Sequence, residues 1–179
     1  MSEKNPINVL MHEHGIIQQL EPVIASLKGL WVSDVEAYKS SITKILRFLK
    51  DYSDGYHHNK EEEVLFPALT DHPDFILEPV LDELLEHHEN FREYAADINI
   101  ALNEQRWADV QAILEKYYDQ LLDHIAIEND ELFIMAENLF SEKELEEMFF
   151  RFADKDRELG ESRKIELEQD PEKIASALV

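Results

Sequence analysis

Apolar residues recur every three or four positions along most of the chain, which is the period of an α-helix. Asn5-Pro6 is a typical helix start, with Asn as the N-cap and Pro in the first turn. Pro22 and Pro67 fall inside apolar repeats, where proline kinks or ends a helix. The pattern predicts four long helices, with approximate ranges 5–29, 33–69, 77–103 and 107–139.

No segment shows the strict alternation of apolar and polar residues that predicts a β-strand. Four long helices with short connections favour an all-α fold, an antiparallel up-down four-helix bundle. Ser141 and Glu144 form a capping-box pattern that begins an additional C-terminal helix, and Gly160 ends it. We therefore expect a bundle over residues 1–140 and a helical appendage with a charged, solvated tail over residues 141–179.

The net charge and the absence of cysteine exclude or disfavour several classes of partner and site. The chain of 179 residues carries 40 acidic and 17 basic residues, a net charge of −23, which disfavours nucleic acid and membrane surfaces as partners. Cysteine is absent, which excludes disulfides, thiolate catalysis and iron–sulfur clusters. Because we find neither a signal peptide nor a long apolar run, we expect a cytoplasmic protein.

Two segments with the same internal spacing carry the candidate chemistry. His57-His58-Asn59-Lys60-Glu61 and His124-Ile125-Ala126-Ile127-Glu128 both read His-x-x-x-Glu, and both are followed by Leu-Phe at the same offset. Residues four apart lie on one face of a helix, so one turn can offer an imidazole and a carboxylate to one site. This ligand set suits Fe, Mn or Zn.

Helical projection at about 100° per residue decides which side chains face the core. It places His124 and Glu128 on the apolar side of their helix. It favours the pair His57 and Glu61 over the neighbouring pair, His58 and Glu62, which projects almost opposite the core.

The other two helices offer one histidine each. His88 continues the apolar stripe of its helix, whereas His87 lies to one side. On the first helix, the spacing leaves the choice between His12 and His14 open. Buried carboxylates at Glu61 and Glu128 need partners, and Lys and Arg are scarce near them, so a metal site is the simplest interpretation.

The sequence resembles the hemerythrin-like, or HHE cation-binding, family over roughly residues 5–140. The resemblance rests on four motifs in order, one per helix: Leu10-Met11-His12-Glu13-His14, His57-His58-Asn59-Lys60-Glu61-Glu62-Glu63-Val64-Leu65-Phe66-Pro67, Leu85-Glu86-His87-His88-Glu89 and His124-Ile125-Ala126-Ile127-Glu128.

The resemblance implies a four-helix bundle holding two non-haem iron ions, with Mn or Zn as alternatives. It implies that Glu61 and Glu128 bridge the two ions. One ion would be bound by His14 and His57, and the other by His88 and His124. His58, Glu62, His12 and His87 remain alternative or additional ligands.

The chain departs from the oxygen-carrying hemerythrins on the third helix, where those proteins have two histidines four apart. Here Leu84 precedes His88 by four residues. The resemblance is therefore closer to the iron-repair and iron-sensing branches. However, these 179 residues contain no cysteine, so we do not expect the cysteine-bearing domain that is typical of the repair proteins.

Three hypotheses follow. The first is a di-iron protein, monomeric or homodimeric, that binds, senses or reduces oxygen, peroxide or nitric oxide. The second is an iron storage or donation protein without redox chemistry. The third is an acidic helical interaction module, with the apolar face of the C-terminal helix as a docking surface. Whether the protein is an enzyme is left open.

Overall fold

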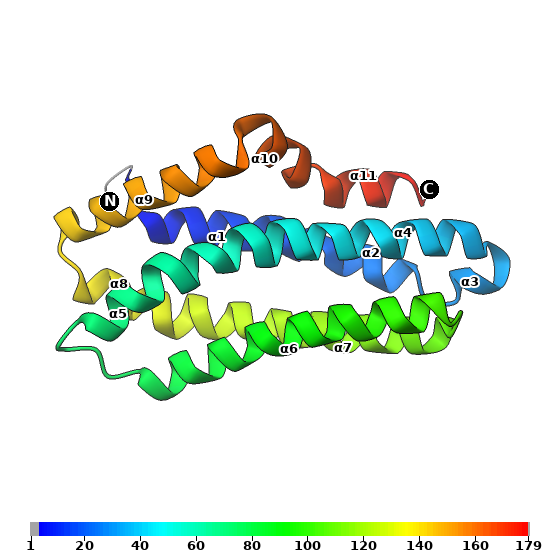
Figure 1. The fold of residues 1–179 in the computed structure, drawn as a ribbon, viewed down its shortest axis with the longest axis horizontal. Coiled ribbons are helices and arrows are strands. Elements are labelled where there is room, and N and C mark those ends of the chain that lie inside the picture. The colour runs from blue at the N-terminus through cyan, green and yellow to red at the C-terminus, as the bar shows by residue number, and fades with distance from the viewer. Residues whose placement is uncertain (1–3, 179) are drawn as a thin grey trace.

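The computed structural model describes residues 4–178 and shows an elongated helical bundle (Figure 1). The first column comprises α1 (Pro6–Ile17), the 3₁₀ turn η1 (Gln18–Leu20) and α2 (Glu21–Ser26). The helix is interrupted just before Pro22, as predicted. A positive φ of 82° at Gly29 then turns the chain into the short α3 (Leu30–Ser33).

The second column is continuous but not uniformly α-helical. It comprises α4 (Val35–Phe48), the π-helical segments η2 (Leu49–His58) and η3 (Glu61–Leu65), and α5 (Phe66–Asp71). Pro67 lies in the first turn of α5 and does not end the column. Proline has no N–H for the carbonyl four residues earlier. That carbonyl, of Glu63, instead accepts a hydrogen bond from Arg151 at 3.0 Å.

The third and fourth columns form a closely packed pair. They are α6 (Glu78–Asn103) and α7 (Trp107–Ile127), and α7 continues through the π-helical segment η4 (Glu128–Leu132) into α8 (Phe133–Leu139). A three-residue turn joins the pair, with Gln105 at a φ of 59°. The columns alternate in direction (Figure 1), so the predicted antiparallel four-helix bundle is confirmed.

The C-terminal residues pack on the bundle as α9 (Glu142–Leu159), α10 (Glu161–Glu168) and α11 (Asp170–Ser176). The predicted capping box at Ser141 and Glu144 is formed. α9 contacts α1 and η3, and α11 contacts α4 and α2 (Figure 1). The tail is more than the solvated surface expected, because Leu167 and Ile174 are buried in the core.

Two apolar clusters fill the bundle. One contains Tyr52, Phe91 and Leu121, and the other contains Leu65, Leu84 and Phe133. In each column, the helical turn that carries the candidate histidine and glutamate residues lies at the boundary between one cluster and the other. Among the helices of residues 4–178, none combines the length and apolarity needed to cross a lipid bilayer.

Candidate metal centre

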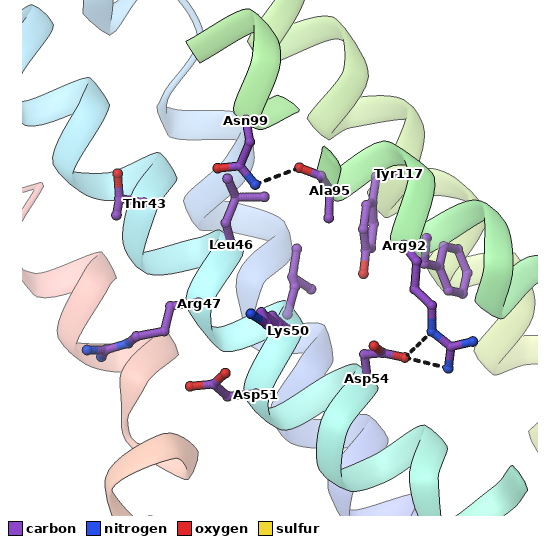
Figure 2. Close-up of a pocket in the computed structure, with 12 residues that line it drawn as sticks. Thr43, Leu46, Arg47, Lys50, Asp51, Asp54, Arg92, Ala95, Asn99 and Tyr117 are labelled. Carbon is purple, nitrogen blue, oxygen red and sulfur yellow. Dashed lines mark hydrogen bonds and ion pairs between the residues drawn. The ribbon is translucent and has the colours of Figure 1, made fainter. Parts of the chain in front are cut away.

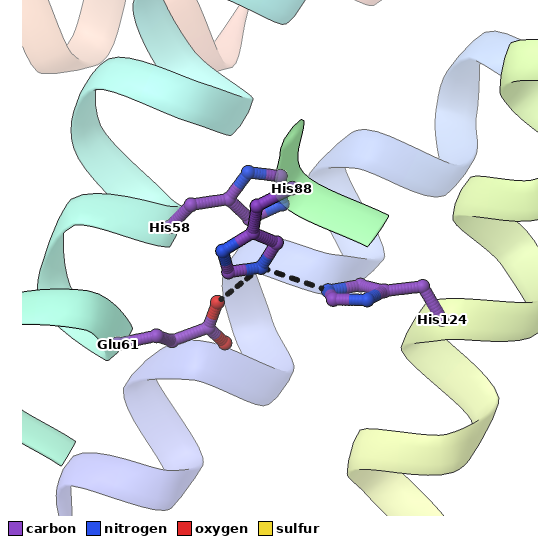
Figure 3. A group of neighbouring side chains, drawn as sticks. All are labelled: His58, Glu61, His88 and His124. Carbon is purple, nitrogen blue, oxygen red and sulfur yellow. Dashed lines mark hydrogen bonds and ion pairs between the residues drawn. The ribbon is translucent and has the colours of Figure 1, made fainter. Parts of the chain in front are cut away.

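Buried histidine and glutamate side chains from all four columns meet inside the bundle. Their ligand atoms form two groups, each with all atoms within 4.8 Å of one another. The groups share Glu61 and contain, respectively, His58, Glu61, His88 and His124 (Figure 3), and His14, His57, Glu61 and Glu128. Every one of these side chains is essentially inaccessible to solvent.

The two carboxylates each span both groups. Glu61 places one oxygen 3.4 Å from His57 Nε2 and the other 3.6 Å from His88 Nε2. Glu128 places one oxygen 3.2 Å from His14 Nε2 and the other 3.2 Å from His124 Nε2. This is the geometry that a carboxylate needs to bridge two metal ions.

Many of these atoms lack a hydrogen bond. Among the described residues, buried atoms without one include both oxygens of Glu61 and of Glu128, both ring nitrogens of His58, and Nε2 of His14 and His57. Leaving buried polar groups unpaired is costly. His88 and His124 also point Nε2 atoms at each other, 3.2 Å apart (Figure 3). Neutral imidazoles and carboxylates arranged in this way fit a pair of cations.

Burial favours the neutral, ligating form of three of the histidines, His57, His58 and His124. It lowers the pKa of His57 to about 4, although the hydrogen bond that His57 donates to Glu13 opposes this. It lowers the pKa of His58 well below the usual range, and the nearby His88 and His124 add to the effect. Burial also lowers the pKa of His124, although Glu128 opposes it.

The pKa values of the two carboxylates, Glu61 and Glu128, are shifted in opposite directions. Burial and the negative charge of Glu128 raise the pKa of Glu61 well above its usual value. Burial opposes ionisation of Glu128 as well, but His124 and His14 outweigh it and hold its pKa well below the usual value. Two adjacent buried carboxylates cannot both ionise cheaply without cations, so bound metal would resolve the conflict.

A second layer of polar residues orients the histidine rings. Glu13 accepts from His57 Nδ1 at 3.0 Å, and Glu62 accepts from His88 Nδ1 at 2.7 Å. Asn129 Oδ1 lies 2.9 Å from His14 Nδ1. In each ring the opposite nitrogen, Nε2, is then left to face the centre. Such partners fix the tautomer and orientation of metal-binding histidines.

The structure brings together all six residues predicted as ligands, which are His14, His57, Glu61, His88, His124 and Glu128. Of the histidines left as alternatives, His12 is exposed and His87 lies outside both groups. Glu62 lies outside both groups too and holds a histidine ring instead.

The prediction that His58 projects away from the core is wrong, because His58 is fully buried and belongs to one of the groups. The projection assumed an α-helix, whereas η2 is π-helical up to His58. Its i→i+5 turns are wider than α-helical turns, so successive residues are separated by a smaller angle. His57 and His58 therefore both face inward, each into a different group. The signal in the sequence was the doubled histidine beside Gly55.

Gly55 is suited to this wide turn. A Cβ added there would lie 3.1 Å from the carbonyl oxygen of Lys50, five residues earlier. A side chain at this position would therefore crowd the backbone that turns His57 and His58 inward.

Comparison with known proteins agrees with the geometry. The family model described as "Hemerythrin HHE cation binding domain" matches residues 5–136. Searches of curated proteins and of solved structures found no match. The match covers all the residues of the two groups and ends before α9.

Proposed function

Because the chain belongs to the hemerythrin HHE cation-binding family, we propose that its two groups of ligands hold two non-haem iron ions. The ion pair would bind, sense or reduce oxygen, peroxide or nitric oxide. The observation that supports this proposal most directly is the pair of carboxylates, each placed between histidines of both groups.

The proposed ligand sets follow from the two groups. His14 and His57 would bind one ion, and His58, His88 and His124 the other, with Glu61 and Glu128 between them. The histidine-poor position, with two imidazoles, would be the more open of the two. An iron pair supplies electrons to small oxidants. The protein supplies a dry, apolar surrounding and holds the ligands in place.

Buried aromatic rings of one apolar cluster pack on a histidine of each group. Phe133 stacks on His14 at 5.5 Å between ring centroids, and Phe66 stacks on His88 at 5.8 Å. With ligand side chains that are at most 1% exposed, this packing leaves little room around the centre. That restriction supports a diatomic or peroxide ligand over a larger substrate.

The test is the metal content of protein purified without oxygen, followed by the absorption spectrum when air is admitted. We expect two irons per chain, matching the two groups, and a new near-ultraviolet charge-transfer band. Zinc alone, or a metal-free protein that stays folded, would contradict the proposal. Two irons that a chelator removes, without any spectral response to oxygen, would instead indicate iron storage or donation.

Single substitutions assign the two positions. His14→Ala and His58→Ala should each reduce the iron content towards one per chain, because each removes a histidine from a different group. His12→Ala, on the same helix as His14, and His87→Ala, on α6 beside His88, are controls at histidines outside both groups and should retain two. Equal losses in the controls would show that the residue assignment is wrong.

A further inference from the structure

A fully buried lysine connects the C-terminal helix α9 to the metal centre. Lys60 Nζ lies 2.5 Å from Glu13 Oε1 and 3.0 Å from Asp156 Oδ1. Glu13, also fully buried, uses its other oxygen to bind His57 Nδ1. Asp156 belongs to α9 and lies outside the residues matched by the family model.

The charges along this chain of contacts alternate in sign. Lys164 donates to Asp156 at 2.8 Å, and Tyr56 donates to the same carboxylate at 2.5 Å. The Lys60 ammonium also lies 3.7 Å from the centroid of the Tyr56 ring. A buried ammonium group is costly unless it is paired and hydrogen-bonded, and here Asp156 provides one of its two carboxylate partners.

Glu13 divides its two oxygens between Lys60 and the metal centre. One oxygen pairs with Lys60 Nζ, and the other accepts from His57 Nδ1–H, which leaves His57 Nε2 to face the centre. On the other side of Lys60, burial opposes ionisation of Asp156, but Lys164, Tyr56 and Lys60 together lower its pKa.

We propose that Asp156 is a positioning residue for the metal centre, acting through Lys60 and Glu13 on His57. The C-terminal appendage then has a function beyond covering the bundle. It stabilises the ligand geometry at the position formed by His14 and His57. The position formed by His58, His88 and His124 has a different orienting residue, Glu62, which accepts from His88 Nδ1.

The first experiment uses the metal-free full-length protein, so it stands apart from the proposed function. Long-range ¹H–¹⁵N NMR reports which ring nitrogen of His57 carries the proton. We expect a single Nδ1–H tautomer in the wild type and a mixture in Asp156→Asn. Asp156→Glu, which keeps the charge, should restore most of the wild-type signal. An unchanged His57 tautomer in Asp156→Asn would overturn the proposal.

The second experiment rests on the proposed function and measures extraction of Co²⁺ from the loaded protein by a chelator. We expect two phases, assigned by their loss in His14→Ala and in His58→Ala. Asp156→Asn should accelerate the phase assigned to His14 and His57 by about 10-fold, the lower end for partners of metal ligands. The other phase should not change.

The matched control is Asp170→Asn. Asp170 also belongs to the appendage and also pairs with a bundle cation, Arg47, at 2.9 Å, but this pair has no contact with the centre. If it accelerates extraction as much as Asp156→Asn does, the effect is docking of the appendage, and the proposal fails. If Co²⁺ does not bind at all, the proposed function fails, and the NMR result still decides the role of Asp156.

A separate cavity of about 490 Å³ lies between α4–η2 and α6, and it carries an independent inference. Its apolar wall includes Leu49, Phe91 and Leu46, the last of which is labelled in Figure 2. Tyr117 is 2% exposed, and its hydroxyl points into the cavity without a hydrogen-bond partner among the described residues (Figure 2). This hydroxyl is therefore available to hydrogen-bond a ligand atom inside the cavity.

The charges at the rim favour an anion. Asp51 and Asp54 are already paired, with Arg163 and Arg92 respectively. Within residues 4–178, the Lys50 ammonium has no ion pair or hydrogen bond. Lys50 is therefore an exposed, unpaired cation at the edge of the apolar wall.

We infer that this cavity binds a small organic anion with a flat apolar body and one charged group. The charged group would lie at Lys50, the body against Leu46 and Phe91, and a polar atom at the Tyr117 hydroxyl. The volume is within the range of small-molecule sites. Phe91 stacks on Tyr117 at 5.1 Å and on His58 at 5.8 Å between ring centroids. An anion bound against Phe91 would therefore touch a ring that packs on a histidine of the metal centre.

The probe is 2-naphthoate, followed by NMR chemical-shift changes in the full-length protein. We expect saturable shifts at residues of the cavity with a Kd of about 1 mM or tighter. Ala95→Trp, which fills the cavity, should abolish binding, and Lys50→Gln and Tyr117→Phe should weaken it. Ala68→Trp is the matched control, because Ala68 lines a different cavity of about 410 Å³. Shifts that do not saturate, or binding retained in Ala95→Trp, would refute the inference.

Discussion

Acid should destabilise the metal-free protein through His57 in particular. The pKa of this residue is about 4 in the folded chain against an ordinary value of 6.5, and burial is the main cause. Between these values the unfolded chain binds a proton that the folded chain does not. Stability therefore falls as the pH drops through this window and is fully present above about 6.5.

The size of the effect follows from the two pKa values. A shift of one pKa unit corresponds to about 1.4 kcal/mol, so the full contribution is about 3 kcal/mol. At pH 5, about 2 kcal/mol of it should be lost. His57 is fully buried, so solvent screening does not reduce this figure appreciably.

The assay is urea unfolding in the presence of a chelator, at pH 7.5 and at pH 5, for wild type and His57→Asn. Asparagine keeps an N–H donor near the position of Nδ1, so the bond to Glu13 can persist, but it does not titrate. The loss of stability on acidification should be about 2 kcal/mol smaller in the variant. His12→Asn, which changes an exposed histidine, should behave as the wild type does. If His57→Asn loses as much stability as the wild type, burial of a neutral His57 is not the source of the acid sensitivity.

Three further results are expected. Glu61→Gln should weaken the binding of metal by more than about 10-fold in chelator competition. The metal-free variant should be at least as stable as the wild type in urea unfolding at pH 7, because the raised pKa of Glu61 already favours a neutral side chain. A less stable metal-free variant would contradict this. Glu62→Gln should weaken the binding of metal by about 10-fold or more, because Glu62 orients His88. It should accelerate only the phase of metal extraction that is assigned to His58, His88 and His124. An effect on the other phase would argue against two separate metal positions. Phe152→Ala should reduce the free energy of unfolding by about 3–5 kcal/mol, because Phe152 packs α9 against the core. Phe150→Ala, at an exposed position on the same helix, should have little effect. Equal losses would show that α9 is not held by the face that carries Phe152.

The sequence by itself determined the helices and most of the candidate site. The apolar period predicted the four columns closely, and the capping box at Ser141 predicted the start of α9, because both are local properties of the chain. The His-x-x-x-Glu spacing placed Glu61 and Glu128 on the same face as their histidines for the same reason. The resemblance to the family selected His14, where spacing left two choices.

Only the tertiary structure decided the inclusion of His58 and the role of Lys60. The direction of His58 depends on π-helical turns, whose departure from the α-helical angle accumulates along η2 and is not visible in a regular projection. In the sequence, Lys60 is only one of the residues between His57 and Glu61. Its partner Asp156 lies 96 residues further along the chain, and the two meet because α9 packs against η3 and α1. Contacts of this kind depend on how the helices close around the core, which no local pattern specifies.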